Sequence, residues 1–204
     1  MELKLSLDGS HALIKKLEDA TMLANKALLR ALRRIGLRLQ RTMMGKVSDD
    51  LLKVRTGNLR RAIFYRVEGR EQESLVRVGV DLTKAIYGRI QNVGGEIRPV
   101  RSKFLTIPLG PNLTGSGVMR VSAREFIANP SSIGFVRSFV TRNKTAIMGV
   151  LPSGQVQPVF ALVRSVRIRP TGYIERSLAD DLLFIEHELD EAAAEVAKDL
   201  TSAE

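Results

Sequence analysis

The residues that could perform chemistry are few in this 204-residue sequence. Histidine occurs only at His11 and His187, and cysteine is absent, which removes thiolate nucleophiles and sulfur ligands for metals. His187 and Glu191 lie four residues apart and would share one face of a helix, as two metal ligands do, but no third ligand is recognisable. A solvated helix face explains this pair better, so we expect no metal and no other cofactor.

Motifs for nucleotide binding and for covalent catalysis are not recognisable either. The segment 149–154 is followed by Gln155, where a phosphate-binding loop requires lysine. Carboxylates for acid–base catalysis would have to come from Glu96, Glu125 and the C-terminal segment, and nothing in the sequence directs them to one pocket. We therefore expect a protein that is not an enzyme, and a hydrolase of unknown type is the weakest alternative.

Charged residues are distributed very unevenly along the chain. The formal net charge is +10 in total, of which 1–66 contribute +9, 67–175 contribute +8 and 176–204 contribute −7. Such asymmetry indicates contact with a polyanion, or contact between oppositely charged segments within one subunit or between neighbouring subunits.

Two helical segments would present these opposite charges. Apolar residues recur at steps of three and four over 10–44, which predicts a long N-terminal helix that Gly36 could kink or break. A second apolar stripe over 174–200 predicts an amphipathic C-terminal helix with an acidic opposite face. The candidate basic face comprises Arg30, Arg33, Arg34, Arg38 and Arg41. The candidate acidic face comprises Asp180, Asp181, Glu188, Glu191 and Glu195.

Three roles are open for the basic face. Its arginines could neutralise DNA phosphates, or they could pair with the acidic helix of the same or a neighbouring subunit. They could also be a solvated surface that suits the dipole of the helix. Because an acidic stripe is available to receive them, we favour an interface over DNA.

The middle of the chain is predicted to be mainly β-structure. The segment 86–108 is expected to form a β-unit in which apolar runs at 86–93 and 104–107 flank a turn at Gly94 and Gly95. The region 109–133 contains many Gly, Pro and Asn residues and predicts a long surface loop. Further strands are expected at 3–7, 59–67 (or a short helical turn that leads into one), 75–80, 134–140, 145–151 and 159–168.

These elements predict an α+β fold: a twisted antiparallel sheet, a long N-terminal helix, a C-terminal amphipathic helix and a long surface loop between strands. We expect one domain over 1–204, with a strand and the basic helix in 1–53, the sheet and its projecting loop in 54–173, and the acidic helix in 174–204. No apolar run is long enough to cross a bilayer, and the first residues lack a signal-peptide pattern. We therefore expect a soluble, unexported protein.

Four segments stand out by their order and spacing. They are 56–63, 87–95 (Tyr-Gly-Arg-Ile-Gln-Asn-Val-Gly-Gly), 103–108 and 167–174. In that order they resemble Thr-Gly-x-Leu-x-x-Ser-Ile, Tyr-Ala-x-Ile-His-Gln-Phe-Gly-Gly, Lys-x-Leu-x-Ile-Pro and Ile-Pro-x-Arg-Pro-Phe-Leu, which are segments of the virion-morphogenesis and tail-completion proteins of long-tailed bacteriophages. The departures are Gln91, Val93, Thr171 and Gly172. The matching scaffold residues are Thr56, Gly57, Leu59, Tyr87, Gly94, Gly95, Leu105, Pro108 and Pro170.

The resemblance implies a structural protein of the head–tail junction, or neck, that forms a homo-oligomeric ring and helps to finish the tail or to join it to the capsid. The implied ring is six-fold, with twelve-fold as the alternative. The implied partners are other neck, connector, tail-terminator or tail-tube proteins and DNA that passes through the lumen, without a membrane. The implied location is the virion, after assembly in the bacterial cytoplasm. The alternative function is a sequence-independent DNA-binding protein that uses the basic helix face.

Overall fold

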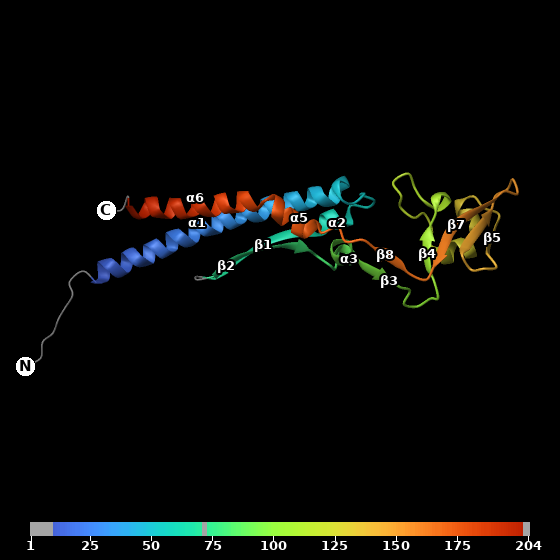
Figure 1. Ribbon diagram of the computed structural model, residues 1–204, viewed down its shortest axis with the longest axis horizontal. Helices are drawn as coiled ribbons and strands as arrows, with labels where there is room; N and C mark the ends of the chain where they lie inside the picture. Colours follow the sequence, from blue (N-terminus) through green and yellow to red (C-terminus); the bar gives the residue numbers. More distant parts are fainter. Residues whose placement is uncertain (1–9, 71–72, 202–204) are drawn as a thin grey trace, which may run out of the picture. The chain divides into compact units, whose positions relative to one another are not determined.

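The computed structural model describes residues 10–70 and 73–201, apart from the side chains of 10–20, 49, 69, 70, 73 and 200. It confirms an α+β protein with antiparallel sheets, a long N-terminal helix and a C-terminal helix (Figure 1). The strand predicted at 3–7 lies outside the described residues. None of the described helices is both long enough and apolar enough to cross a membrane.

The chain divides into two compact units. The first unit consists of Met1–Leu52, Asn58–Gly88 and Gly172–Glu204, and the second consists of Lys53–Gly57 and Arg89–Thr171. We call them the helical unit and the basic unit, after the long helices of the first and the charge of the second. Each is described separately below.

Helix α1 (Ser10–Gly45) is the longest element of the helical unit. Its 36 residues span about 54 Å at about 1.5 Å per residue. The helix continues through Gly36 without a break, and the reason for the glycine is packing. A Cβ at this position would lie 2.6 Å from Tyr65 Cδ2 and 2.8 Å from Val76 Cγ2, so glycine allows α1 to approach these side chains closely.

The side chains that α1 approaches at Gly36 belong to a two-stranded antiparallel hairpin, β1 (Ile63–Arg70) and β2 (Glu73–Val80). A π-helical turn η1 (Lys46–Asp50) and the short helix α2 (Asn58–Ala62) precede it. The prediction that a short helical turn leads into the first strand is therefore confirmed. Both strands extend beyond the predicted 59–67 and 75–80, to Arg70 and back to Glu73.

The C-terminal segment folds as two helices, where the sequence predicted one continuous helix. Helix α5 (Tyr173–Asp180) and helix α6 (Leu182–Thr201) are separated at Asp181, whose side chain is buried. Helix α6 packs along α1 (Figure 1), with Ala27, Ala31 and Ala192 buried between them. These small side chains allow the two helices to approach closely.

The segment 86–93, predicted as a strand, contains the short helix α3 (Gly88–Val93). A short apolar run has no periodicity that distinguishes a strand from a helix, which explains the error. Gly94 and Gly95, where the sequence predicts a turn, have positive φ values of +72° and +149°. Gly94 donates its N–H to the Ile90 carbonyl oxygen over 2.9 Å, so the glycine ends a helix and does not join two strands.

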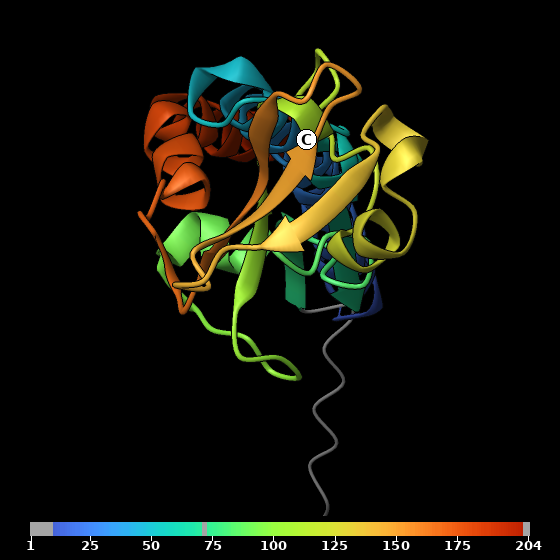
Figure 2. The same cartoon turned by 90° about the vertical axis from the view of Figure 1, so that its right-hand side faces the viewer.

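The basic unit contains two separate sheets, where one sheet was predicted. Strand β3 (Gly95–Ile97) pairs with β8 (Val166–Ile168) in a two-stranded ribbon. The other sheet has the order β4-β7-β6-β5 (Figure 2). Its strands are β4 (Leu105–Pro108), β5 (Arg137–Val140), β6 (Ala146–Val150) and β7 (Val156–Val163). The predicted strand 159–168 is thus divided between the two sheets.

The region 109–133 is ordered and partly buried, which corrects the prediction of a long surface loop. It contains η2 (Gly110–Asn112), α4 (Ala123–Ala128) and η3 (Pro130–Ile133). The buried Asn112 side chain donates to the Val121 carbonyl oxygen over 2.8 Å and accepts from its N–H over 3.1 Å. Phe126 is fully buried against Phe135 and Phe160. One polar anchor and one aromatic side chain therefore hold a region that contains few apolar residues.

Candidate functional site

Four segments of the sequence resemble segments of the phage proteins, and we call them the family-like segments. Three of them, 56–63, 87–95 and 167–174, meet inside the helical unit at Gly88. The buried Tyr173 hydroxyl donates a hydrogen bond to the Gly88 carbonyl oxygen over 3.0 Å. A Cβ on residue 88 would lie 2.9 Å from Val80 Cγ1 and 3.1 Å from Leu59 Cδ1, so a larger residue would displace its neighbours. Segments that are far apart in the sequence thus form one packed site.

Two of these segments also meet inside the basic unit, around Gly94. Thr171 donates its backbone N–H and its hydroxyl to the Gln91 carbonyl oxygen, over 3.1 and 2.8 Å. Pro170 lies directly against Gly94, where a Cβ would be only 2.8 Å from the proline nitrogen. The sequence analysis grouped these residues by resemblance, and the structure places them in contact.

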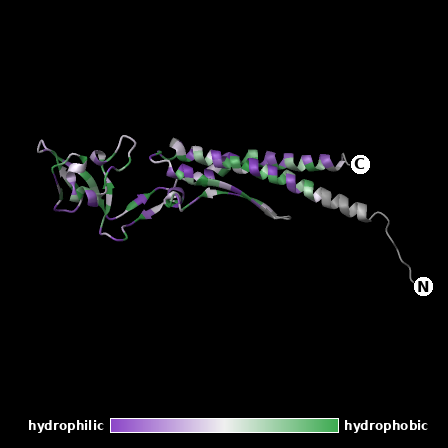
Figure 3. Cartoon of the chain, turned by 180° about the vertical axis from the view of Figure 1, so that it is seen from behind, coloured by the Kyte–Doolittle hydropathy of each residue, from purple (hydrophilic) through white to green (hydrophobic). Residues whose placement is uncertain are grey.

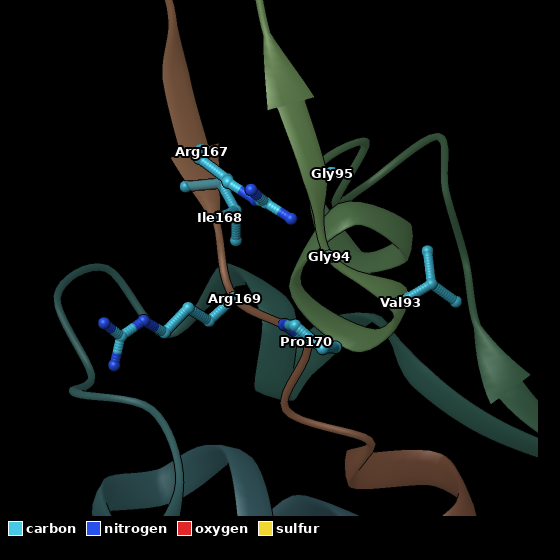
Figure 4. Close-up of a pocket in the computed structure, with 7 residues that line it drawn as sticks. All are labelled: Val93, Gly94, Gly95, Arg167, Ile168, Arg169 and Pro170. Carbon is cyan, nitrogen blue, oxygen red and sulfur yellow. The ribbon is translucent and has the colours of Figure 1, made fainter.

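An open groove of about 710 Å³ lies beside Gly94 (Figure 4). The Arg167 side chain extends toward β3, and the Arg169 side chain extends away from α3. None of the seven described residues that line the groove is a histidine, a cysteine or a carboxylate. The groove therefore offers cations and backbone groups, and its lining supplies no nucleophile or general base. The lining residues are Val93, Gly94, Gly95, Arg167, Ile168, Arg169 and Pro170.

The remaining family-like residues are located elsewhere. Leu105 and Pro108 belong to β4 in the four-stranded sheet, opposite residues of β7. Thr56 and Gly57 precede α2, and Gly57 has a positive φ of +69°. Tyr87 is partly exposed just before α3.

Tyr173 is the buried ionisable group of the Gly88 contact. Burial, followed by the nearby Glu175 carboxylate, raises the pKa of its phenol to about 12. The ordinary value is about 10. Between these two values the unfolded chain loses the phenolic proton while the folded chain retains it, so rising pH favours unfolding.

We expect Tyr173→Phe to lower the free energy of unfolding by about 1 kcal/mol at neutral pH, because the Gly88 carbonyl loses its donor. Between pH 10 and 12 the wild type should lose about 2 kcal/mol through this group, a loss that the phenylalanine variant lacks. Urea unfolding followed by circular dichroism from pH 7 to pH 11.5 measures both effects. A stability difference between the two proteins that stays constant with pH would contradict the assignment.

Ion pairs join the predicted basic and acidic faces within the same chain. Arg30 Nη2 lies 2.7 Å from Glu195 Oε1, Arg34 pairs with Glu188, and Arg38 Nε lies 3.0 Å from Asp181 Oδ1. The three arginines recur every four residues on α1 and meet carboxylates on or next to the antiparallel α6. The sequence left open whether the basic face pairs with DNA, with a neighbouring subunit or with the acidic helix of its own chain. These three arginines pair with carboxylates of their own chain.

Not every predicted member belongs to this ladder of ion pairs. Arg33 and Arg41 form no ion pair with any residue that the structure describes. Glu191 Oε1 lies 3.6 Å from His187 Nε2, as the spacing of these two residues predicted.

Lys46 is an ion-pair residue that was not predicted from the sequence. Its Nζ lies 2.8 Å from Asp180 Oδ2 and 3.1 Å from Asp50 Oδ2. Hydrogen bonds to Asp180 and then to Asp50 raise the pKa of Lys46. Lys46 and Asp50 lie four residues apart, a spacing from which their ion pair could have been predicted.

Asp181 is the most buried carboxylate of the ladder. Its side chain is 2% exposed, whereas its partner Arg38 is 57% exposed and lies 5.6 Å from the centroid of the Phe184 ring. Asp181 Oδ2 has no hydrogen-bond partner among the described residues. Arg38 is therefore the principal compensation for a charge that has been removed from water.

Comparisons with protein-family models, with curated proteins and with solved structures find no match to this chain. Among the described residues, no group of three or more His, Cys, Asp or Glu side chains could hold a metal ion.

Proposed function

We propose that this chain is a structural subunit of the head–tail junction or tail end of a long-tailed bacteriophage, and that it assembles into a ring that helps to join the tail to the capsid. The observation that supports this proposal is the convergence of the family-like segments at Gly88 and Gly94. Contact between these segments is what we expect if they maintain one shared architecture.

Exposed apolar side chains support the assembly part of the proposal. In the helical unit they include Leu182, Leu183 and Leu189 of α6, with exposed fractions of 50, 81 and 40%. The hairpin β1–β2 is a two-stranded sheet, so each strand has one edge that no described strand covers. Apolar helix surfaces and open strand edges are features that subunit contacts cover.

Native mass spectrometry of the purified full chain, and of neck–tail complexes that contain it, tests the ring. We expect one closed oligomer, six-fold or twelve-fold, in at least the complexes. Leu182→Glu combined with Leu189→Glu should shift the population toward smaller species, whereas Glu186→Gln on the same helix should not. A monomer in both preparations would refute the ring.

Electron micrographs of virions that lack the protein distinguish the two possible positions. Unjoined heads and complete tails would indicate action at the junction, and tails of aberrant length or end structure would indicate action at the tail end. Normal virions would contradict the proposal.

Sequence-independent DNA binding through α1 remains the second candidate. We rank it below assembly because Arg30, Arg34 and Arg38 already have carboxylate partners in the same chain. An arginine in such a pair would have to exchange its partner for a phosphate.

A further inference from the structure

The positive charge of this protein is concentrated in the basic unit. Lys53–Gly57 and Arg89–Thr171 together contain 14 Lys and Arg residues, two Glu residues and no Asp, a formal net charge of +12. The rest of the chain has 18 basic and 20 acidic residues, a net charge of −2. The division into units therefore separates a nearly neutral part from a strongly basic one, which the charge profile along the sequence did not show.

Six of these cations lie in or next to the ribbon formed by β3 and β8: Arg167 belongs to β8, and the other five flank the strands. The two strands are antiparallel, and Glu96 lies opposite Arg167. The segment after β3 and the segments on either side of β8 therefore extend from the same short ribbon. The ribbon itself alternates hydrophilic and hydrophobic residues (Figure 3). We call this set the basic ribbon, and all six of its cationic residues are exposed. They are Arg98, Arg101, Lys103, Arg164, Arg167 and Arg169.

One carboxylate belongs to this surface. Glu96 accepts hydrogen bonds from Arg98 Nε and Nη2, over 3.0 and 2.8 Å. A hydrogen bond from Ser165, followed by the one from Arg98, lowers the pKa of Glu96, so the carboxylate stays ionised. It neutralises one of the six cations, and the basic ribbon retains a net charge of about five. Apart from Arg98, these cations form no ion pair with a residue that the structure describes.

We propose that the basic ribbon binds the phosphate backbone of duplex DNA. Arginine supplies 11 of the 14 cations in the basic unit, and its planar guanidinium matches phosphate oxygens better than an ammonium group does. A two-stranded ribbon is narrow enough to follow a groove of duplex DNA, with its arginines reaching the phosphates on either side. The basic unit has almost no carboxylates. A surface of this kind suits a continuous polyanion as its ligand better than a protein partner, whose surface carries charges of both signs.

This inference goes beyond ring assembly and does not depend on it. It also assigns DNA contact to a different surface from the α1 face considered above. A ring whose subunits bind no DNA, and a DNA-binding monomer, are both observable results, so the two proposals can fail separately.

Fluorescence anisotropy of a labelled 20-base-pair duplex, titrated with the full chain at several salt concentrations, tests the proposal. The ribbon variant replaces Arg164, Arg167 and Arg169 with Gln. The matched control replaces Lys26, Arg33 and Arg41 of α1 with Gln, which removes the same charge. We expect the ribbon variant to bind at least about tenfold more weakly at low salt, and its slope of log K against log salt to fall by about two to three.

A second variant, Arg101→Gln with Lys103→Gln, changes only the segment after β3 and guards against misfolding of the first. It should weaken binding severalfold, and the α1 control should bind within about twofold of the wild type. Equal losses for the ribbon and α1 variants, a larger loss for the α1 variant, or no binding of DNA by the wild type would overturn the proposal. Equally tight binding of polyglutamate would also overturn it, because the surface would then recognise acidic polypeptides.

Discussion

Gly94→Ala is expected to destabilise the basic unit by about 2–4 kcal/mol. The glycine has φ +72°, a conformation that costs an L-residue about 1 kcal/mol or more. The added Cβ would also lie 2.8 Å from both Pro170 N and Pro170 Cδ and 3.0 Å from the Ile168 carbonyl oxygen. Two of these atoms are backbone and cannot rotate away, so the chain that connects β8 to α5 has to move, at an overpacking cost of about 1–3 kcal/mol.

Two other glycines of the same unit separate the backbone cost from the steric cost. Gly154 has φ +83° and open space around its Cβ position, so Gly154→Ala should cost only about 1 kcal/mol. Gly115 also has open space and no positive φ, and Gly115→Ala should be nearly neutral.

Hydrogen exchange measured by mass spectrometry resolves these effects along the chain. Protection of 89–97 and 166–171 should fall strongly in Gly94→Ala and little in either control. Equal behaviour of Gly94→Ala and Gly154→Ala would show that contact with Pro170 contributes nothing.

Arg38→Ala is expected to lower the free energy of unfolding of the helical unit by about 2–3 kcal/mol. The substitution leaves the buried Asp181 carboxylate without its cation, a situation that costs about 3–5 kcal/mol when both partners are buried. The estimate is lower here because Arg38 is half exposed and water screens part of the interaction.

Arg30→Ala is the matched control on the same helix face. Arg30 and Glu195 are 53 and 41% exposed, so this pair should contribute no more than about 1 kcal/mol. Combining Arg38→Ala with Asp181→Asn should recover about 1 kcal/mol or more relative to Arg38→Ala, because the buried group is then neutral. Urea unfolding followed by circular dichroism in the helix band, at roughly 222 nm, provides the comparison, because most of the helical signal comes from this unit. Equal losses for Arg38→Ala and Arg30→Ala would refute the role assigned to burial.

Local signals predicted the two long helical segments and most strands. The apolar stripe of α1 predicted a helix to about Met44, and the structure ends it at Gly45. One local signal was available but not used: Ser122 and Glu125 have the spacing of a capping box, and the Ser122 hydroxyl accepts from the Glu125 N–H over 3.2 Å at the start of α4. That spacing would have predicted a helix inside the supposed loop.

Other errors could not be corrected from local patterns. The division of 159–168 between two sheets depends on which strand each half meets, since β7 pairs with β4 and β6, and β8 pairs with β3. Likewise, the partner of the buried Asp181 carboxylate, at the break between α5 and α6, is Arg38, which is 143 residues away in the chain.

The candidate sites show the same division. The amino-acid sequence by itself determined the helical periods, the glycines that take positive φ and the presence of an acidic stripe complementary to a basic one. Tertiary structure decided that Arg30, Arg34 and Arg38 meet carboxylates of their own chain, and that the unneutralised charge belongs to the basic unit. Periodicity and φ preference are properties of neighbouring residues, whereas ion pairing and net charge per unit depend on which distant segments fold together.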